Sequence, residues 1–362
     1  MYLLKSFVLS VLTVFTCAVS HADEKNTVKL GVLTSLSGAV AEWGQNTREG
    51  MELALDEVNS EVEIHGRTLQ LLFEDFGNLD PKKTSSGAQR LLQIEKVRVL
   101  LTQWAEDTEI AWPLARKENV LTMTYAAGSR DITKGRKLLF RIWPSDDLLI
   151  RRVIRYAAAA STAKPCIIWE QTAYFESMRA IAEEEWLALT KAKPLTIEHA
   201  PDVTDFRSYV LPLKECSSIV LLTEVNLLAT LVRQVHAVNP SALLLSYPAV
   251  AAQSVLDNAG SGLDGVIYAA YPTATSEFAH RFAARYGHPP APPAASAYDA
   301  VKILGQVIQK RGTLTEKIVS GLREIQNFPG ASGTVSFTED GDRSPLDSQL
   351  YKVIGGKVEP IG

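Results

Sequence analysis

The stretch VKLGVLTSLSGAVAEWGQ, residues 28–45, decides the fold. Its first half alternates apolar residues, with Val28, Leu30 and Val32 on one face, and is typical of a β-strand. A loop of small residues at 35–38 follows, and Trp43-Gly44 then opens a helix. The apolar residues of that helix recur at helical spacing: Met51, Ala54, Leu55 and Val58. A strand that runs into a helix through such a loop leaves backbone N–H groups at the helix start free to meet a ligand.

The chain has 362 residues, enough for two domains with cores of their own. Residues 1–22 are typical of a secretory signal, because Lys5 precedes an apolar run at 7–19 and small residues follow it. Cleavage after Ser20 or after Ala22 satisfies the preference for small residues. The run is too short for a membrane span, and no later segment is apolar enough for one. We therefore expect an exported protein.

Charge and cysteine content further limit the class of protein to which the chain can belong. The net charge is −4, and no basic tract is interleaved with aromatic residues, so we expect no nucleic-acid partner. Removal of the signal leaves two cysteines, Cys166 and Cys216. An oxidising compartment permits a disulfide between them, and two unpaired buried thiols are the alternative.

Strand and helix patterns alternate along most of the chain. The first set of strands is predicted at Val28–Leu33, Gln70–Glu74, Val97–Leu101, Val120–Thr124 and Phe140–Ile142. The second set is predicted at Cys166–Trp169, Leu195–Glu198, Ile219–Leu222, Leu243–Ser246 and Val266–Ala269. Such alternation is typical of parallel sheets covered on both faces, so we predict an α/β protein of two doubly wound lobes. A helical segment from Glu277 to about Ile325 is expected to return and cover the first lobe.

Two residues predict where individual helices begin and end. Asp80 is placed to cap a helix that begins at Pro81. Pro212 lies inside the helix predicted at Phe206–Lys214 and should kink or shorten it.

Catalytic signatures are absent from the sequence. A GxGxxG pattern at 260–265 precedes a predicted strand, whereas a dinucleotide site needs it to follow one. The six histidines have no metal-ligand spacing. We therefore expect a protein that is not an enzyme, with no metal and no cofactor.

A set of short motifs, in order and spacing, resembles the periplasmic solute-binding proteins of the branched-chain amino acid (Leu/Ile/Val) type. The motifs are VKLGVLTSLSG, Trp43-Gly44, Glu74-Asp75, Asp80-Pro81-Lys82-Lys83, Phe140-Arg141, Pro144-Ser145-Asp146, Tyr174, Thr204-Asp205-Phe206, Tyr298-Asp299-Ala300 and Gly333 through Val335-Ser336-Phe337 to Gly341-Asp342. The resemblance implies the type I periplasmic binding fold, in which two Rossmann-like lobes close on a ligand across a three-segment hinge. It places lobe 1 at residues 23–142 and 272–342, and lobe 2 at residues 143–271 and 343–362.

The resemblance also implies a ligand shell, and this sequence departs from it. Ala105, between Trp104 and Glu106, stands where amino-acid binders have a Ser for the ligand carboxylate. The small-residue–Thr loop of the family falls on Ala126-Ala127-Gly128, with Ser129 after it. The acidic residue that holds the ligand ammonium falls on Pro248, beside Tyr247.

Other positions of that shell offer replacements. Trp43 and Tyr174 keep their expected places on the two sides of the cleft, and Glu224 stands at the end of a strand of lobe 2. A buried ammonium ion without a counter-charge costs several kcal/mol, and Glu224 and Glu106 are the acidic candidates. Because three positions of the amino-acid shell are missing together, the sequence favours a neutral or anionic solute over an amino acid.

The resemblance implies the solute-binding component of an ABC importer, located in the periplasm. Its partners would be a small-molecule solute and the permease and ATPase subunits of a membrane importer, and we expect a monomer. A free periplasmic co-sensor for an amide or small carboxylate is the alternative, since sensory domains use the same fold.

Overall fold

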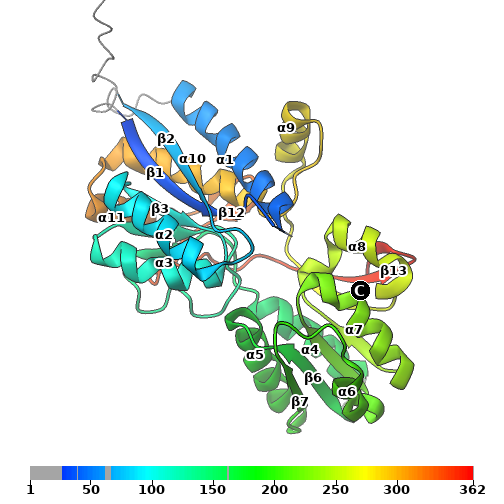
Figure 1. Ribbon diagram of the computed structural model, residues 1–362. Coiled ribbons are helices and arrows are strands. Elements are labelled where there is room, and N and C mark those ends of the chain that lie inside the picture. Colours follow the sequence, from blue (N-terminus) through cyan, green and yellow to red (C-terminus); the bar gives the residue numbers. More distant parts are fainter. Residues whose placement is uncertain (1–26, 39, 62–66, 161–162, 362) are drawn as a thin grey trace, which may run out of the picture.

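The computed structural model describes residues 27–38, 40–61, 67–160 and 163–361. The secretory signal predicted over residues 1–22 lies outside these described residues. Every helix within these ranges is too short or too polar to span a lipid bilayer. The chain forms two α/β lobes that are joined by loop segments (Figure 1).

Lobe 1 is built on a five-stranded parallel sheet in the order β2-β1-β3-β4-β5. Its strands are β1 (Thr27–Thr34), β2 (Thr68–Asp75), β3 (Val99–Thr102), β4 (Leu121–Thr124) and β5 (Leu139–Arg141). The register pairs Thr27 with Thr68 and Thr34 with Asp75. Because β1 and β3 are neighbours while the chain leaves them in opposite directions, a crevice opens between their carboxyl ends.

Helices cover both faces of the lobe 1 sheet. The first face packs against α1 (Ala41–Glu61), α9 (Ser276–Tyr286), α10 (Ala294–Arg311) and α11 (Thr315–Arg323). The second face packs against α2 (Pro81–Gln89) and α3 (Ala105–Lys117). Successive side chains of β1 point to opposite faces of the sheet. Val32 therefore packs in the core on the first face, and Leu33 packs in the core on the second. The expected return of the 277–325 segment to lobe 1 is confirmed.

The sequence correctly marked the start of α2. Asp80 accepts hydrogen bonds from the backbone N–H groups of Lys82 (2.8 Å) and Lys83 (3.2 Å), and Pro81 is the first helical residue. These bonds satisfy N–H groups that have no partner inside the helix.

Lobe 2 contains a seven-stranded sheet in the order β14-β13-β10-β9-β8-β6-β7. The strands predicted from sequence are its parallel part: β6 (Pro165–Glu170), β7 (Leu195–His199), β8 (Ser218–Leu222), β9 (Leu243–Leu245) and β10 (Ile267–Ala270). Two antiparallel strands, β13 (Gln349–Ile354) and β14 (Lys357–Pro360), extend it beside β10. The expectation of five strands in each lobe was therefore wrong for lobe 2.

Helices α4 (Asp147–Ala160) and α5 (Ala173–Thr190) cover one face of this sheet. The other face packs against α6 (Arg207–Val210), α7 (Val225–Val238) and α8 (Gln253–Ala259). Pro212 has the predicted effect, because α6 ends before it and a 3₁₀ helix at Leu211–Glu215 replaces the remainder. A disulfide joins Cys166 in β6 to Cys216 before β8, with the two Cα atoms 6.0 Å apart.

Three segments cross between the lobes, from β5 to α4, from β10 to α9, and from β12 (Gly333–Val335) to β13 (Figure 1). Arg141 fastens the first crossing to the third. Its buried guanidinium forms a two-point ion pair with Asp342, Nε–Oδ1 2.7 Å and Nη2–Oδ2 2.5 Å. The neighbouring Arg343 donates to the carbonyl of Ile142 over 3.0 Å. These bonds hold the first and third crossings together.

Candidate functional site

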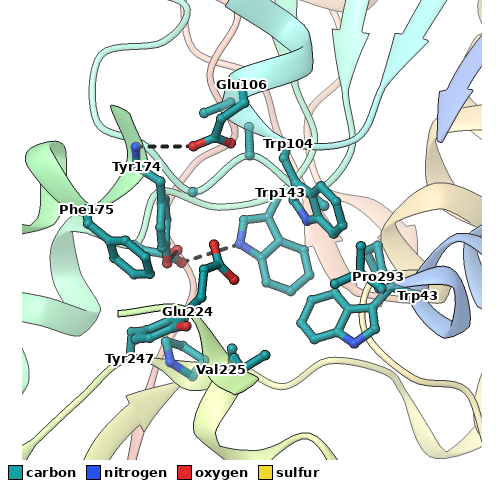
Figure 2. Close-up of a pocket in the computed structure, with 18 of the residues that line it drawn as sticks. Trp43, Trp104, Glu106, Trp143, Tyr174, Phe175, Glu224, Val225, Tyr247 and Pro293 are labelled. Atoms are coloured by element: carbon teal, nitrogen blue, oxygen red, sulfur yellow. Dashed lines mark hydrogen bonds between the residues drawn. The ribbon is translucent and has the colours of Figure 1, made fainter. Parts of the chain in front are cut away.

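A cavity of about 150 Å³ lies between the lobes, where the carboxyl ends of both sheets meet. Both lobes and the first crossing contribute to its wall (Figure 2). Its lining residues are Val40, Trp43, Leu79, Trp104, Ala105, Glu106, Ala126, Ala127, Gly128, Trp143, Asp146, Tyr174, Phe175, Glu224, Val225, Tyr247, Pro248, Ala249 and Pro293. A cavity of roughly this size holds a single benzene ring, so the site suits a small solute.

Buried hydrogen bonds hold the lobe 1 loops of the cavity in place. The side-chain oxygen of Gln103 accepts from Thr34 Oγ1 (2.8 Å) and from the backbone N–H of Ser35 (3.0 Å). This ties the loop after β1 to the loop after β3. A Cβ atom at Gly44 would lie 1.7 Å from the carbonyl oxygen of Ser35, so a glycine there lets α1 begin close to the loop and presents Trp43 to the cavity.

The loop after β3 positions Trp104 and Glu106. The Asp107 carboxyl group accepts from the N–H groups of Gln103 (2.8 Å) and Trp104 (2.6 Å), and burial raises its pKa to about 8. The Trp104 ring packs against Trp43 with centroids 6.2 Å apart and the planes inclined by 57°. The two indoles form one apolar wall of the cavity.

A matching set of bonds positions the lobe 2 wall. Oε2 of Glu170, at the end of β6, accepts from Thr223 Oγ1 (2.9 Å) and from the backbone N–H of Glu224 (3.0 Å). The hydroxyl of Tyr247 donates to the carbonyl of Thr223 over 2.9 Å. The loops after β6, β8 and β9 are thereby joined, and Glu224 projects into the cavity (Figure 2).

The first crossing supplies Trp143 and Asp146. The Asp146 carboxyl group accepts from Tyr174 Oη (2.8 Å) and from Trp143 Nε1 (3.4 Å), and burial raises its pKa. The backbone N–H of Asp146 donates to the carbonyl of Gly128 over 2.9 Å. A Cβ atom on Gly128 would lie 1.8 Å from Asp146 Oδ2, so this close approach requires glycine.

The two glutamates of the cavity have raised pKa values. Burial raises the pKa of Glu106, whose Oε1 accepts from the backbone N–H of Tyr174 across the cleft over 3.4 Å. Burial, followed by the negative charges of Glu170 and Glu106, raises the pKa of Glu224 to about 7. Each carboxyl group lies in surroundings that disfavour its charged form.

The structure brings together nearly all of the residues predicted for the site. Those that line the cavity are Trp43, Trp104, Ala105, Glu106, Ala126, Ala127, Gly128, Tyr174, Glu224 and Tyr247. Ser129 does not line it, because its carbonyl accepts from the buried Arg141 Nη1 over 2.5 Å and holds the loop toward the hinge. Among the aromatic and ionisable lining residues, sequence reasoning missed Trp143, Asp146 and Phe175, of which Asp146 belongs to a motif that was recognised but was not placed in the site.

The cavity is suited to enclosing a solute. Aromatic rings and three carboxyl groups dominate the lining, and no Lys, Arg or His is among the described residues that form it. No group of three or more potential metal ligands occurs in the described ranges. The arrangement can bury an apolar or aromatic group and offer oxygen acceptors to a donor.

Comparisons with known proteins agree with this geometry. The model of a family described as periplasmic binding protein matches residues 27–357. The chain is 25% identical to the Leu/Ile/Val-binding protein homolog 3 of Brucella melitensis, over 98% of this chain and 98% of that protein. It is 23% identical to a leucine-, isoleucine-, valine-, threonine- and alanine-binding protein of Pseudomonas aeruginosa, over 92% and 91% of the two chains.

Solved structures share the fold. A leucine-binding protein of Thermotoga maritima superposes with a TM-score of 0.82 at 21% identity, covering 92% of this chain and 98% of that one. An ABC transporter solute-binding protein of Rhodopseudomonas palustris, solved with benzoate, gives a TM-score of 0.79 at 20% identity, covering 93% and 96%.

Proposed function

The chain belongs to the periplasmic binding protein family, a family of solute-binding proteins, and from this premise we propose that it is the extracytoplasmic solute-binding component of an ABC importer. The observation that carries the proposal is the cavity of about 150 Å³ whose wall is shared by both lobes. A solute held there would contact both lobes at once. It would be delivered to the permease and ATPase subunits of the importer.

Closure of the two lobes would provide the capture step. A ligand stabilises the closed arrangement only if it contacts that arrangement better than the open one. Trp43 and Trp104 come from lobe 1, while Tyr174 and Glu224 come from lobe 2, so their simultaneous contact with a solute requires a closed cleft. Rotation about the three crossings would bring the two walls together.

The solute need not be a branched-chain amino acid. Ala105, the loop Ala126-Ala127-Gly128 and Pro248 line the cavity where the resemblance places the Ser, the Thr-containing loop and the acidic residue of the amino-acid binders. The benzoate complex of the Rhodopseudomonas protein supports this, because a structure with the same fold accommodates a ligand without an ammonium group. The aromatic lining and the small volume favour a compact solute with an apolar part.

A ligand screen followed by scattering tests the proposal. The mature chain is screened by thermal shift against amino acids, amides, carboxylates and amines. A ligand at a hundred times its dissociation constant adds about 2.7 kcal/mol to the free energy of unfolding. Small-angle scattering should then show a smaller radius of gyration with the confirmed ligand than without it. An unchanged radius at saturation would contradict capture by closure.

Two aromatic-to-alanine variants control the experiment. Trp104→Ala removes one wall of the cavity and should abolish both the thermal shift and the compaction. Tyr156→Ala truncates an exposed aromatic side chain on α4 that does not line the cavity, and should preserve both.

A further inference from the structure

The ionisable side chains that line the cavity are all acidic. Glu106, Asp146 and Glu224 line it, and the part of the chain that the structure describes contributes no basic side chain to the wall. An anion inside would face these carboxyl groups without a compensating cation. A cation would instead pair with a carboxylate, and their attraction would offset the free-energy cost of removing that carboxylate from water.

The three carboxyl groups differ in how much hydrogen-bond acceptor capacity they have left for a ligand. Both oxygens of Asp146 already accept hydrogen bonds, from Tyr174 and Trp143. Glu106 accepts from the backbone N–H of Tyr174. No side chain of the described residues donates to the Glu224 carboxyl group, which projects into the cavity between the lobe 2 tyrosines and the tryptophans (Figure 2). Of the three, Glu224 therefore keeps the most acceptor capacity for a ligand.

The aromatic rings around Glu224 present their faces to the cavity. The hydroxyls of Tyr174 and Tyr247 are directed away, to Asp146 and to the carbonyl of Thr223. Their rings are 5.9 Å apart and inclined by 68°, while Trp43 and Trp104 form the opposite wall. Inclined rings around an acidic group bind ammonium ions well, because each ring face carries partial negative charge.

These particular rings have no cationic partner within the protein. Arginine or lysine side chains do lie over four other rings, those of Phe73, Trp112, Trp169 and Tyr298. None of the cation–π pairs recorded for the described residues involves a ring of the cavity wall. Among the described residues, no basic side chain therefore competes with a cationic ligand for these rings.

We propose, on the basis of the solute-binding function above, that the solute is a compact organic cation, an amine or quaternary ammonium compound without a carboxylate. Its ammonium group pairs with Glu224 and lies against the rings of Tyr174, Tyr247 and the tryptophans. This differs from the neutral or anionic solute that the sequence favoured, because the sequence could not show that the wall lacks a basic side chain.

The protonation of Glu224 gives the proposal a measurable signature. The titratable groups that face Glu224 are Glu170 from β6, Glu106 from α3 and the tyrosines, and none of them is basic. Because the pKa of Glu224 is about 7, a cation must displace a proton below this pH. Affinity for a cation should then rise about tenfold from pH 6 to pH 8, whereas affinity for an anion should fall.

The test uses sets of small-molecule ligands in which each set shares one carbon skeleton and differs in charge. The first set is 3-methylbutylamine, leucine and 4-methylpentanoate, which share a branched aliphatic skeleton. The second is benzylamine, benzyl alcohol and benzoate, and the third is choline with its uncharged analogue 3,3-dimethyl-1-butanol. Dissociation constants are measured by calorimetry at pH 6, 7 and 8 for the wild type, for Glu224→Gln, and for Glu359→Gln as an exposed lobe 2 control.

The expected result is binding of at least one amine or quaternary ammonium probe, at least tenfold tighter than its neutral or carboxylate partner. Glu224→Gln should weaken that binding by about tenfold or more at pH 8 and abolish its pH dependence, while Glu359→Gln leaves both unchanged. The proposal of a cationic solute would be overturned if leucine, 4-methylpentanoate, benzyl alcohol or benzoate bound more tightly than the matching amine. It would also be overturned if Glu224→Gln left amine binding unchanged. Either result would leave the solute-binding function in place. Failure of every cationic probe to bind would overturn the cationic solute alone, because the thermal-shift screen and scattering test the solute-binding function separately.

Discussion

The guanidinium of Arg130 and the carboxylate of Glu184 form a two-point ion pair across the cleft, Nη1–Oε2 2.5 Å and Nη2–Oε1 2.6 Å. Arg130 belongs to the loop between β4 and β5 of lobe 1, and Glu184 lies on α5 of lobe 2. The backbone N–H of Arg130 also donates to Ser177 Oγ on the same helix, over 3.1 Å. The Arg130 hydrogen bonds lower the pKa of Glu184 to about 2, so the pair is charged at neutral pH.

Arg130→Gln should therefore favour the open arrangement of the lobes. Partly exposed ion pairs contribute up to about 1 kcal/mol, so affinity for the tightest solute of the screen should fall by up to about fivefold. The radius of gyration of the solute-free protein should increase slightly. Arg207→Gln is the matched control, because it breaks an exposed pair with Asp205 inside lobe 2. Equal affinities for the two variants would show that the cross-lobe pair has no part in closure.

Gly128→Ala should destabilise the protein and disturb the cavity. The new Cβ atom would lie 1.8 Å from Asp146 Oδ2, so the bond between Asp146 and Tyr174 must break or the loop must move. Overpacking of this kind costs roughly 1–3 kcal/mol, which thermal or denaturant unfolding can measure. In Gly262→Ala the nearest atom is the flexible end of Arg233 at 3.2 Å, and we expect little change. An equal loss of stability in both variants would exclude the close approach of Gly128 to Asp146 as its cause.

The disulfide should contribute measurably to the stability of lobe 2. Cys166 and Cys216 are separated by 50 positions, and closing a loop of that length stabilises a fold by roughly 3–5 kcal/mol in the chain-entropy model. Reductant should lower the denaturation midpoint of the wild type and leave that of the double variant Cys166→Ala/Cys216→Ala unchanged. Labelling of two thiols in the unfolded, unreduced mature protein would show that the bond does not form.

Glu224 should make the solute-free protein less stable as the pH rises. Its pKa is raised from 4.5 to about 7 in the folded state, so the folded state retains a proton that the unfolded chain releases. The free energy of unfolding should therefore fall between about pH 4.5 and pH 7, by roughly 1–3 kcal/mol. Glu224→Gln should remove this part of the pH dependence, and the exposed Glu359→Gln should not. Parallel pH profiles for the wild type and Glu224→Gln would refute the raised pKa.

The sequence predicted the parts of the fold whose hydrophobic pattern is regular. Strands of the parallel sheets, such as β1 and β8, are apolar runs followed by helices, so periodicity located them. The antiparallel pair β13–β14 was missed, although the Gly355-Gly356 turn between its strands is a hairpin signal. The second strand has only four residues, and no helix of the described residues follows either strand to mark it.

The same distinction explains the predictions for the site. Residues within a few positions of a strand end, such as Glu106 and Glu224, could be located because the sequence pattern marks where the strand ends. Trp143 lies in a crossing whose course depends on Arg141 and on segments about two hundred residues away in sequence, such as Asp342. Ser129 was placed in the shell by its neighbours, but a long-range bond from Arg141 holds it elsewhere. Contacts between distant segments determine these positions, and sequence periodicity does not encode such contacts.

The order of the chain through the two lobes has a consequence during folding. Lobe 1 lacks α10, a main part of its first core, until the chain up to residue 311 is available, and β10 of lobe 2 stays an open sheet edge until it pairs with β13 at residues 349–354. An unpaired strand edge can pair wrongly with other chains. Neither lobe can therefore complete its native packing until nearly the whole polypeptide is available to fold.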